Sequence, residues 1–226
     1  MSEFKYTKPI QMIRATHYGN NYWVFYSRKL GRRVTAFSNL EYENLITLEM
    51  DHRVIHYCEQ PCEQEVIIDG KKNKTIFDVY VVYEDGREEL QEVKYAEELE
   101  ADTQQGQRSR EQINRQKYWC LQNDIDYLVR TDKEIEVGPY TSRNLAYLNS
   151  RSRRVSTDVS FNKAFRQILA DNGNTLTIGR LYLSGIISKN NGLSFIADLY
   201  YQGIIRFADL DNAPITNSTE VVLNGK

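Results

Sequence analysis

One short stretch restricts the possible folds more than any other. Residues 75–98, TIFDVYVVYEDGREELQEVKYAEE, have the pattern of a β-hairpin. The loop must lie within residues 84–87, where Asp-Gly supplies the residues that tight hairpin turns prefer. One flanking run carries Asp78 and the other carries Glu92 and Lys94, at positions where a sheet normally holds apolar side chains. The loop length decides which of these charges share a face, because a shift of one residue turns every side chain over.

Two loop lengths are compatible with this pattern. A loop of two residues places Asp78 opposite Val93. A loop of three residues, 84–86, places Gly86 at the left-handed position that follows a type I turn, and Asp78 then lies opposite Glu92.

The three-residue loop would gather charges on one patch of sheet. Directly opposed residues have Cβ atoms about 5 Å apart, so the carboxylates of Asp78 and Glu92 would be close. Lys94 would share their face, because side chains alternate along a strand. Two opposed carboxylates repel each other unless a cation lies between them, so this register predicts a divalent metal site.

A third carboxylate is expected on a helix within residues 36–51, which Ser38 or Asn39 can cap. Glu41 lies on the side of this helix that packs inward, with Leu40, Leu45 and Leu48 at helical spacing. Glu43 points about 200° away from Glu41 and is expected to be solvated. A carboxylate on an apolar face is costly to bury unless it is paired or binds a metal, so Glu41 is the third candidate ligand.

The remaining pattern predicts two domains. Strands are expected at 53–61, 64–70 and 125–132, with a second helix at 109–124. Together with the hairpin they describe a mixed α/β domain over residues 1–150. The Arg- and Ser-rich segment 149–158 is the expected linker to a second domain, 151–226.

Charge is distributed unevenly along the chain. The net charge of −2 argues against a protein that coats nucleic acid. The first 36 residues nevertheless hold seven Lys and Arg against one Glu, and a second basic stretch runs from Arg143 to Arg166. An acidic block lies between them, from Glu84 to Glu111. Basic flanks around an acidic middle suit a nuclease, with cations on phosphates and carboxylates on metal; solvated surface charge is the alternative. The cations expected on the DNA backbone are Arg28, Lys29, Arg32 and Arg33.

Composition and targeting signals indicate a cytoplasmic protein of bacterial type. Apolar residues make up 41% of the chain and charged residues 27%, as in ordinary globular proteins. No apolar run approaches the roughly 20 residues of a membrane span, and the N-terminus lacks the apolar core of a signal peptide. Three cysteines leave one unpaired, which favours reduced thiols.

These residues lead to a family resemblance. Asp78 with Glu92-Val93-Lys94 resembles the D…(D/E)-x-K active site of restriction-endonuclease-like nucleases. The surrounding segments SRKLGRRVTAFSNLEYENLITLEMDHRVIHYCEQP and QKYWCLQNDIDYLVRTDKEI resemble, in order, motifs of the TnsA transposon endonuclease family. The resemblance covers roughly residues 28–138. It implies a restriction-endonuclease-like mixed sheet flanked by helices, followed by a small, mainly α, winged-helix-like module.

The resemblance also implies a site and partners. Glu41, Asp78, Glu92 and Lys94 are the implied catalytic set. The first three, with the backbone carbonyl of Val93, would hold one or two Mg²⁺ or Mn²⁺ ions, since all-oxygen ligands favour these metals over zinc. In the family this subunit cuts the 5′ strands of double-stranded DNA at transposon ends, together with a TnsB-type DDE transposase under the control of a TnsC-type AAA+ ATPase.

Several other signals have competing interpretations. His52, His56, Cys58 and Cys62 have zinc-like spacing, but four residues in a strand-rich region do not readily converge, so no zinc site is expected. Gln60 could orient a metal water or a phosphate, or simply form a turn, and Lys117 could contact the DNA backbone. Two other functions stay open: a stand-alone restriction- or phage-type endonuclease, and a non-catalytic adaptor, which would be expected to have lost these carboxylates or the lysine.

The C-terminal segment is expected to bind a protein partner more than to read bases. A helix at 161–169 is followed by a helix-turn-helix order whose second helix spans about 193–201. This helix carries Asp198 as its charge, which a phosphate-rich groove would repel, whereas Tyr200 and Tyr201 suit a protein interface. A helix pair that only caps the first domain is the alternative.

Overall fold

The computed structural model describes residues 4–10, 21–68, 70–152, 159–188 and 190–225. The chain forms two compact units: Met1–Glu49 with Arg53–Ile135, and Met50–His52 with Glu136–Lys226. The expected linker 149–158 falls mostly outside the described residues, at 153–158. The compact units divide after Ile135, and the domain limits near residue 150 stay a prediction.

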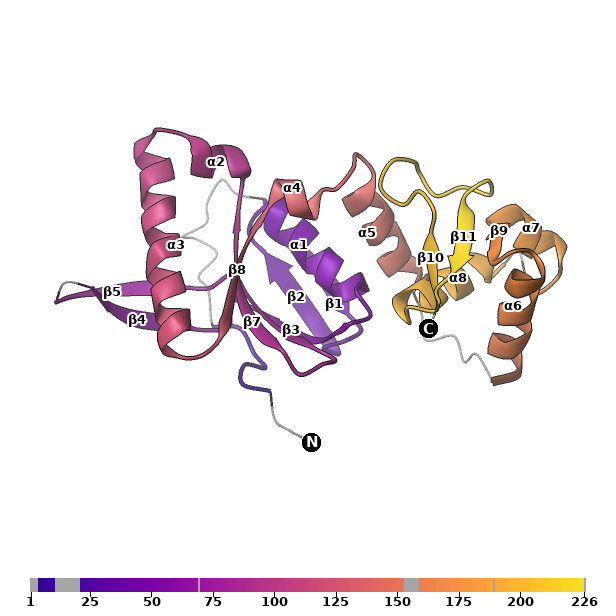
Figure 1. Ribbon diagram of the computed structural model, residues 1–226, viewed down its shortest axis with the longest axis horizontal. Helices are drawn as coiled ribbons and strands as arrows, with labels where there is room; N and C mark the ends of the chain where they lie inside the picture. Colours follow the sequence, from indigo (N-terminus) through magenta and orange to yellow (C-terminus); the bar gives the residue numbers. More distant parts are fainter. Residues whose placement is uncertain (1–3, 11–20, 69, 153–158, 189, 226) are drawn as a thin grey trace. The chain divides into compact units, whose positions relative to one another are not determined.

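The centre of the first unit is a four-stranded mixed sheet with the order β3-β6-β7-β8 (Figure 1). β3, β6 and β7 pair antiparallel, and β8 runs parallel to β7. Two separate two-stranded ribbons, β1–β2 and β4–β5, accompany it. The elements are β1 (Trp23–Ser27), β2 (Arg32–Ala36), α1 (Asn39–Met50), β3 (Val54–Glu59), β4 (Glu63–Ile68), β5 (Lys71–Ile76), β6 (Val79–Tyr83), β7 (Glu88–Lys94), α2 (Ala96–Glu100), α3 (Gln104–Gln122), β8 (Asp126–Thr131) and α4 (Asp132–Ile135).

The sheet is covered on both faces, which explains why β6 reads VYVVY without a polar face. On one face, Val79 and Val81 pack with Leu45 and Leu48 of α1. On the other face, Tyr80, Val82 and Leu90 pack with Cys120 of α3. The prediction of a mixed sheet flanked by helices is confirmed.

The hairpin β6–β7 has the register of the three-residue loop. The backbone N–H of Tyr83 donates to the carbonyl of Arg87 at 2.9 Å, and Gly86 has φ of 85°. The strand ladder, continued by one residue beyond β6, places Asp78 opposite Glu92. Of the two loop lengths compatible with the sequence, the structure has the three-residue loop. The turn in this way sets the register of the hairpin.

The sequence predicted only the first strand of the β4–β5 ribbon. The KKNK segment of β5 has little apolar content and gave no strand signal. Ion pairs of Lys72 with Glu65 and Lys74 with Glu63, at 2.9 and 2.6 Å, link the two strands. Charge pairing across the ribbon thus replaces the apolar alternation that marks most strands.

The second unit contains four helices and a three-stranded antiparallel sheet of order β10-β11-β9 among its described residues. Its elements are α5 (Thr141–Arg151), α6 (Val159–Asp171), β9 (Thr175–Thr177), α7 (Ile178–Leu183), α8 (Gly192–Tyr201), β10 (Ile205–Phe207) and β11 (Glu220–Leu223). The expected helices correspond to α6, α7 and α8. No helix among the described residues of the chain has the length and apolar character needed to cross a membrane.

One argument about α8 was wrong. The argument that a phosphate-rich groove would repel Asp198 requires an accessible carboxylate, but its side chain is buried and accepts a hydrogen bond from Nε2 of Gln202 at 2.7 Å. Helix α8 packs against α5, so most of its surface is covered. The sequence pattern of a single helix could not show this, because the covering helix lies some 50 residues earlier in the chain.

Candidate active site

The hairpin β6–β7 brings an ion pair and a second carboxylate together. Nζ of Lys94 lies 2.7 Å from Oε1 of Glu92, whose side chain is fully buried. Oδ2 of Asp78 accepts a hydrogen bond from the backbone N–H of Val93 at 2.7 Å. Asp78 is therefore held against the strand that carries Glu92 and Lys94.

Helix α1 adds Glu41 to the same site. Oγ of Ser38 accepts a hydrogen bond from the backbone N–H of Glu41, and Oε2 of Glu41 accepts one from the N–H of Phe37, each at 3.1 Å. These reciprocal bonds form a capping-box arrangement that orients the Glu41 side chain. Glu41 lines one pocket, of about 380 Å³, together with Asp78, Glu92 and Lys94.

Electrostatics in this pocket disfavour negative charge on the carboxylates. Burial raises the pKa of Asp78, and the nearby Glu41 raises it further, against the opposing effect of Lys94. Burial and the charge of Asp78 raise the pKa of Glu92. Burial also raises the pKa of Glu41. Burial by itself would lower the pKa of Lys94, but Glu92 and Asp78 outweigh it and raise that pKa. The lining also contains Glu63, Lys74 and Arg115, so the acids outnumber the cations by one. This excess of negative charge favours a further cation.

Two glutamines of α3, which the sequence analysis did not identify, donate hydrogen bonds to the carboxylate of Glu92. Nε2 of Gln112 donates to Oε1 of Glu92 at 2.8 Å, and Nε2 of Gln116 donates to Oε2 at 2.7 Å. Gln116 is itself fixed by the hydroxyl of Tyr127, which donates to its Oε1 at 2.7 Å. The spacing of four residues between the glutamines was a usable signal for one helix face, but it did not indicate that this face meets Glu92.

Gln60 also belongs to the site. It has a left-handed φ of 35°, which is uncommon and strained for a residue other than glycine. Its backbone N–H donates to the carbonyl of Asp78 at 2.8 Å, and its side-chain Nε2 lies 3.4 Å from Oε2 of Glu41. Gln60 therefore joins the start of β6 to the start of α1.

The segment that contains this hairpin matches a known protein family. Residues 51–132 match the family model of the TnsA-like endonuclease N-terminal domain. This segment is similar to the TnsA-like endonuclease domain. A search of curated proteins found no match to the chain. The match supports a nuclease of the transposase family.

The TnsA-like segment contains Gln60, Asp78, Glu92 and Lys94, whereas Glu41 lies before its first residue. The structure nevertheless places Glu41 on the same pocket as the other four. The family match and the geometry are thus independent observations that overlap on the hairpin.

No group of three or more His, Cys, Asp or Glu in the described ranges is already arranged to hold a metal ion. In the TnsA-like hairpin, both oxygens of Glu92 accept hydrogen bonds from glutamines, and one oxygen of Asp78 accepts a hydrogen bond from the N–H of Val93. The donor chemistry fits a divalent cation, because clustered carboxylates with raised pKa values gain most from added positive charge. To bind such a cation, Glu92 would have to give up one of its hydrogen bonds with the glutamines.

The remaining predicted contact residues do not line the carboxylate pocket. Arg28 and Lys29 lie in the β1–β2 turn, where their backbone N–H groups donate to Oε1 of Glu49 at 2.9 and 3.4 Å. Glu49 is eight residues beyond Glu41 on α1, about 12 Å along the helix axis. This turn is therefore at the other end of α1 from the pocket.

The other cations have different surroundings. Arg32 forms an ion pair with the buried Glu59 at 2.6 Å, whereas Arg33 is exposed on β2. Lys117 is exposed on α3. Of the residues with zinc-like spacing, His56, Cys58 and Cys62 are buried in the first unit, and His52 belongs to the second.

Proposed function

We propose that the protein is the metal-dependent DNA endonuclease subunit of a heteromeric transposase, which cleaves the 5′ strands at transposon ends beside a TnsB-type transposase. The observation that carries this proposal is the convergence of Glu41, Asp78, Glu92 and Lys94 on one pocket within and beside a TnsA-like endonuclease domain. A non-catalytic adaptor would have no need to keep four such groups together.

Glu41, Asp78 and Glu92 are the residues that would hold Mg²⁺ or Mn²⁺, and the carbonyl of Val93 is a further proposed ligand. When bound, the ion supplies Lewis-acid stabilisation of phosphate charge and lowers the pKa of water. All these ligands are oxygens, which these hard cations prefer.

The protein groups have their own roles in this proposal. Lys94 stays protonated, because the carboxylates beside it raise its pKa, so it can stabilise charge on the phosphate in the transition state. Gln112 and Gln116 orient Glu92. Gln60 links Glu41 and Asp78, because it contacts the Glu41 carboxylate with its side chain and the Asp78 carbonyl with its backbone N–H.

The test is strand-specific cleavage of transposon-end DNA by the full chain together with its transposase. Asp78→Asn and Glu92→Ala should each lower 5′-strand cleavage by about 10²–10³-fold, while 3′-strand cleavage by the transposase continues. Asp126→Asn, an exposed acid at the start of β8, is the control and should cleave normally. Wild-type cleavage by Asp78→Asn would refute the assignment, and full activity without the transposase would favour a stand-alone endonuclease.

We further propose that the second unit is a winged-helix-like module that binds a protein partner, the TnsC-type ATPase or the transposase. The order α6-β9-α7-α8-β10-β11, with sheet order β10-β11-β9, supports the first part. The covering of α8 by α5 supports the second, because a helix packed in this way has little surface left to enter a major groove.

This second proposal is tested on an exposed apolar residue of the second unit. Leu183 is 87% exposed at the end of α7, and Leu121 is 77% exposed on α3 of the first unit. Leu183→Asp in the full chain should weaken capture of the ATPase or the transposase, whereas Leu121→Asp should not. Unchanged capture of both partners, with weakened DNA binding, would instead indicate a DNA-reading module.

A further inference from the structure

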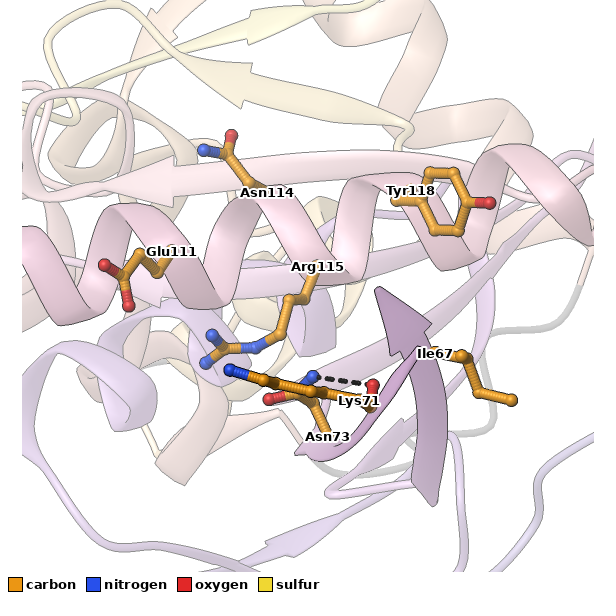
Figure 2. A pocket seen from close by; sticks show the side chains of 7 residues that line it. All are labelled: Ile67, Lys71, Asn73, Glu111, Asn114, Arg115 and Tyr118. Carbon is orange, nitrogen blue, oxygen red and sulfur yellow. Dashed lines mark hydrogen bonds between the residues drawn. The ribbon is translucent and has the colours of Figure 1, made fainter. Parts of the chain in front are cut away.

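A second groove lies beside the carboxylate pocket, between α3 and the β4–β5 ribbon. It has a volume of about 600 Å³. Lys71 and Asn73 line it from the ribbon, and Asn114, Arg115 and Tyr118 line it from α3 (Figure 2). Among these side chains, Arg115 of α3 and Lys71 of the ribbon extend toward each other (Figure 2).

Arg115 connects this groove to the carboxylate pocket, because it lines both. Its Nε is buried and has no hydrogen-bond partner among the described residues. A guanidinium that is partly withdrawn from water normally pairs with an anion, since an unsatisfied buried donor is costly. Arg115 thus lies at the edge of the carboxylate pocket, and no acidic residue among those described forms an ion pair with it.

The cations of the ribbon separate into paired and unpaired groups. Lys72 and Lys74 form ion pairs with Glu65 and Glu63. Lys71 forms no ion pair with any described residue, and its side chain extends along the groove toward the guanidinium of Arg115 (Figure 2).

Glu111 is the acid on the lining and has to be weighed against these cations. It lies one helical turn before Arg115, but its Oε1 accepts a hydrogen bond from Nε2 of Gln107 at 3.2 Å. It forms no ion pair with Arg115, both residues being in the described part of α3. The two facing cations therefore remain available to an external anion.

We propose that this groove binds the phosphate backbone of the DNA strand that leads away from the scissile phosphate. Arg115 holds the phosphate nearest to the carboxylate pocket, and Lys71 holds a phosphate further along the groove. Planar guanidinium groups bind phosphate with two parallel hydrogen bonds, whereas lysine binds it as a point charge. This inference rests on the proposed endonuclease function and names where its substrate runs.

The experiment measures binding of transposon-end DNA by the full chain with its transposase, without divalent metal, across a series of NaCl concentrations. Each phosphate contact contributes about 0.9 to the slope of log K against log [salt]. Arg115→Gln and Lys71→Gln should each lower the slope by about 0.9, and the double variant by about 1.8. Arg87→Gln is the matched control, because Arg87 is an exposed cation at the far end of the hairpin, bonded to Asp85 at 2.9 Å. Its slope should equal that of the wild type.

A second measurement locates the contact. A neutral methylphosphonate next to the scissile bond should slow cleavage by the wild type, with little further effect on Arg115→Gln, because both changes remove the same contact. Additive effects, or slopes for Arg115→Gln and Lys71→Gln equal to that of Arg87→Gln, would overturn the groove proposal while leaving the endonuclease intact. Loss of transposase capture with an unchanged slope would overturn it in favour of an acidic protein segment. Absence of wild-type cleavage would instead reject the proposed function itself.

Discussion

Asp78 and Glu92 lie opposite each other beside Lys94, and burial is the main influence on how both carboxyl groups titrate. The pKa of Asp78 is raised to about 7 and that of Glu92 to about 8, with burial as the largest cause for each. Near neutral pH the two groups therefore hold protons that ordinary carboxyl groups would have lost.

Cleavage should consequently rise with pH through the range 7 to 8. A carboxyl group must lose its proton before it can bind a cation, so the active fraction grows as pH passes each raised pKa. Single-turnover 5′-strand cleavage from pH 6 to 9 measures this. Higher Mg²⁺ should move the profile to lower pH, because the cation competes with protons. A profile that is flat over this range at low Mg²⁺ would contradict the prediction.

At the scale of elements, α1 presents two glutamates that differ in surroundings. Glu41 lines the carboxylate pocket and also bonds to the N–H of Phe37. Glu43 was expected to be solvated, but it is partly buried and affects the pKa of Tyr42. Its neighbour Tyr42 is covered by β1, where Trp23 stacks on the Tyr42 ring at 4.6 Å.

Glu41→Gln should impair cleavage by about 100-fold, whereas Glu43→Gln should change it little. Glutamine keeps the oxygen that accepts from Phe37, so the helix cap survives while the charge is lost. The comparison is made by cleavage rate, with thermal unfolding of both variants as the check on folding. Equal losses from the two substitutions would show that Glu41 acts through the helix and has no special place in the pocket.

The β6–β7 turn depends on a single glycine. Gly86 has φ of 85°, a conformation that costs an L-residue roughly 1–2 kcal/mol. Gly86→Ala should therefore lower the urea midpoint of the first unit, and Gly225→Ala, at a glycine without positive φ or near neighbours, should not. Equal midpoints for the two variants would mean that the turn can change type without cost.

For the whole molecule, the raised pKa values link stability to pH. The folded state binds more protons than the unfolded chain between about pH 4 and 8, so stability should fall as pH rises through this range. Burial makes the charged form of Asp78 unfavourable in the folded protein. Removing this charge should therefore increase the free energy of unfolding at high pH.

Asp78→Asn should raise the Tm at pH 8 by about 2–4 °C, for a stabilisation on the order of 1 kcal/mol. The gain should vanish at pH 4, where Asp78 is protonated in the folded wild type. Thermal unfolding at both pH values, without divalent metal, is the measurement, and Asp126→Asn is the control. A destabilised Asp78→Asn at pH 8 would show that its hydrogen bond with Val93 outweighs the charge.

The sequence alone determined what depends on local chemistry. The Asp-Gly pair limited the hairpin to two registers, one of which is the observed three-residue loop, because turn geometry is set by adjacent residues. Ser38 and the leucine spacing were enough to predict which side of α1 carries Glu41. Both predictions concern residues close together in the chain, and both hold in the structure.

Tertiary structure alone decided which distant elements meet. The glutamines on Glu92 come from a helix about 20 residues later in the chain, and the groove at Arg115 needs α3 to lie beside a charged ribbon. The burial of Asp198 likewise requires α5 to cover α8. Long-range packing responds to the summed burial of many side chains, so no short pattern encodes any of these contacts.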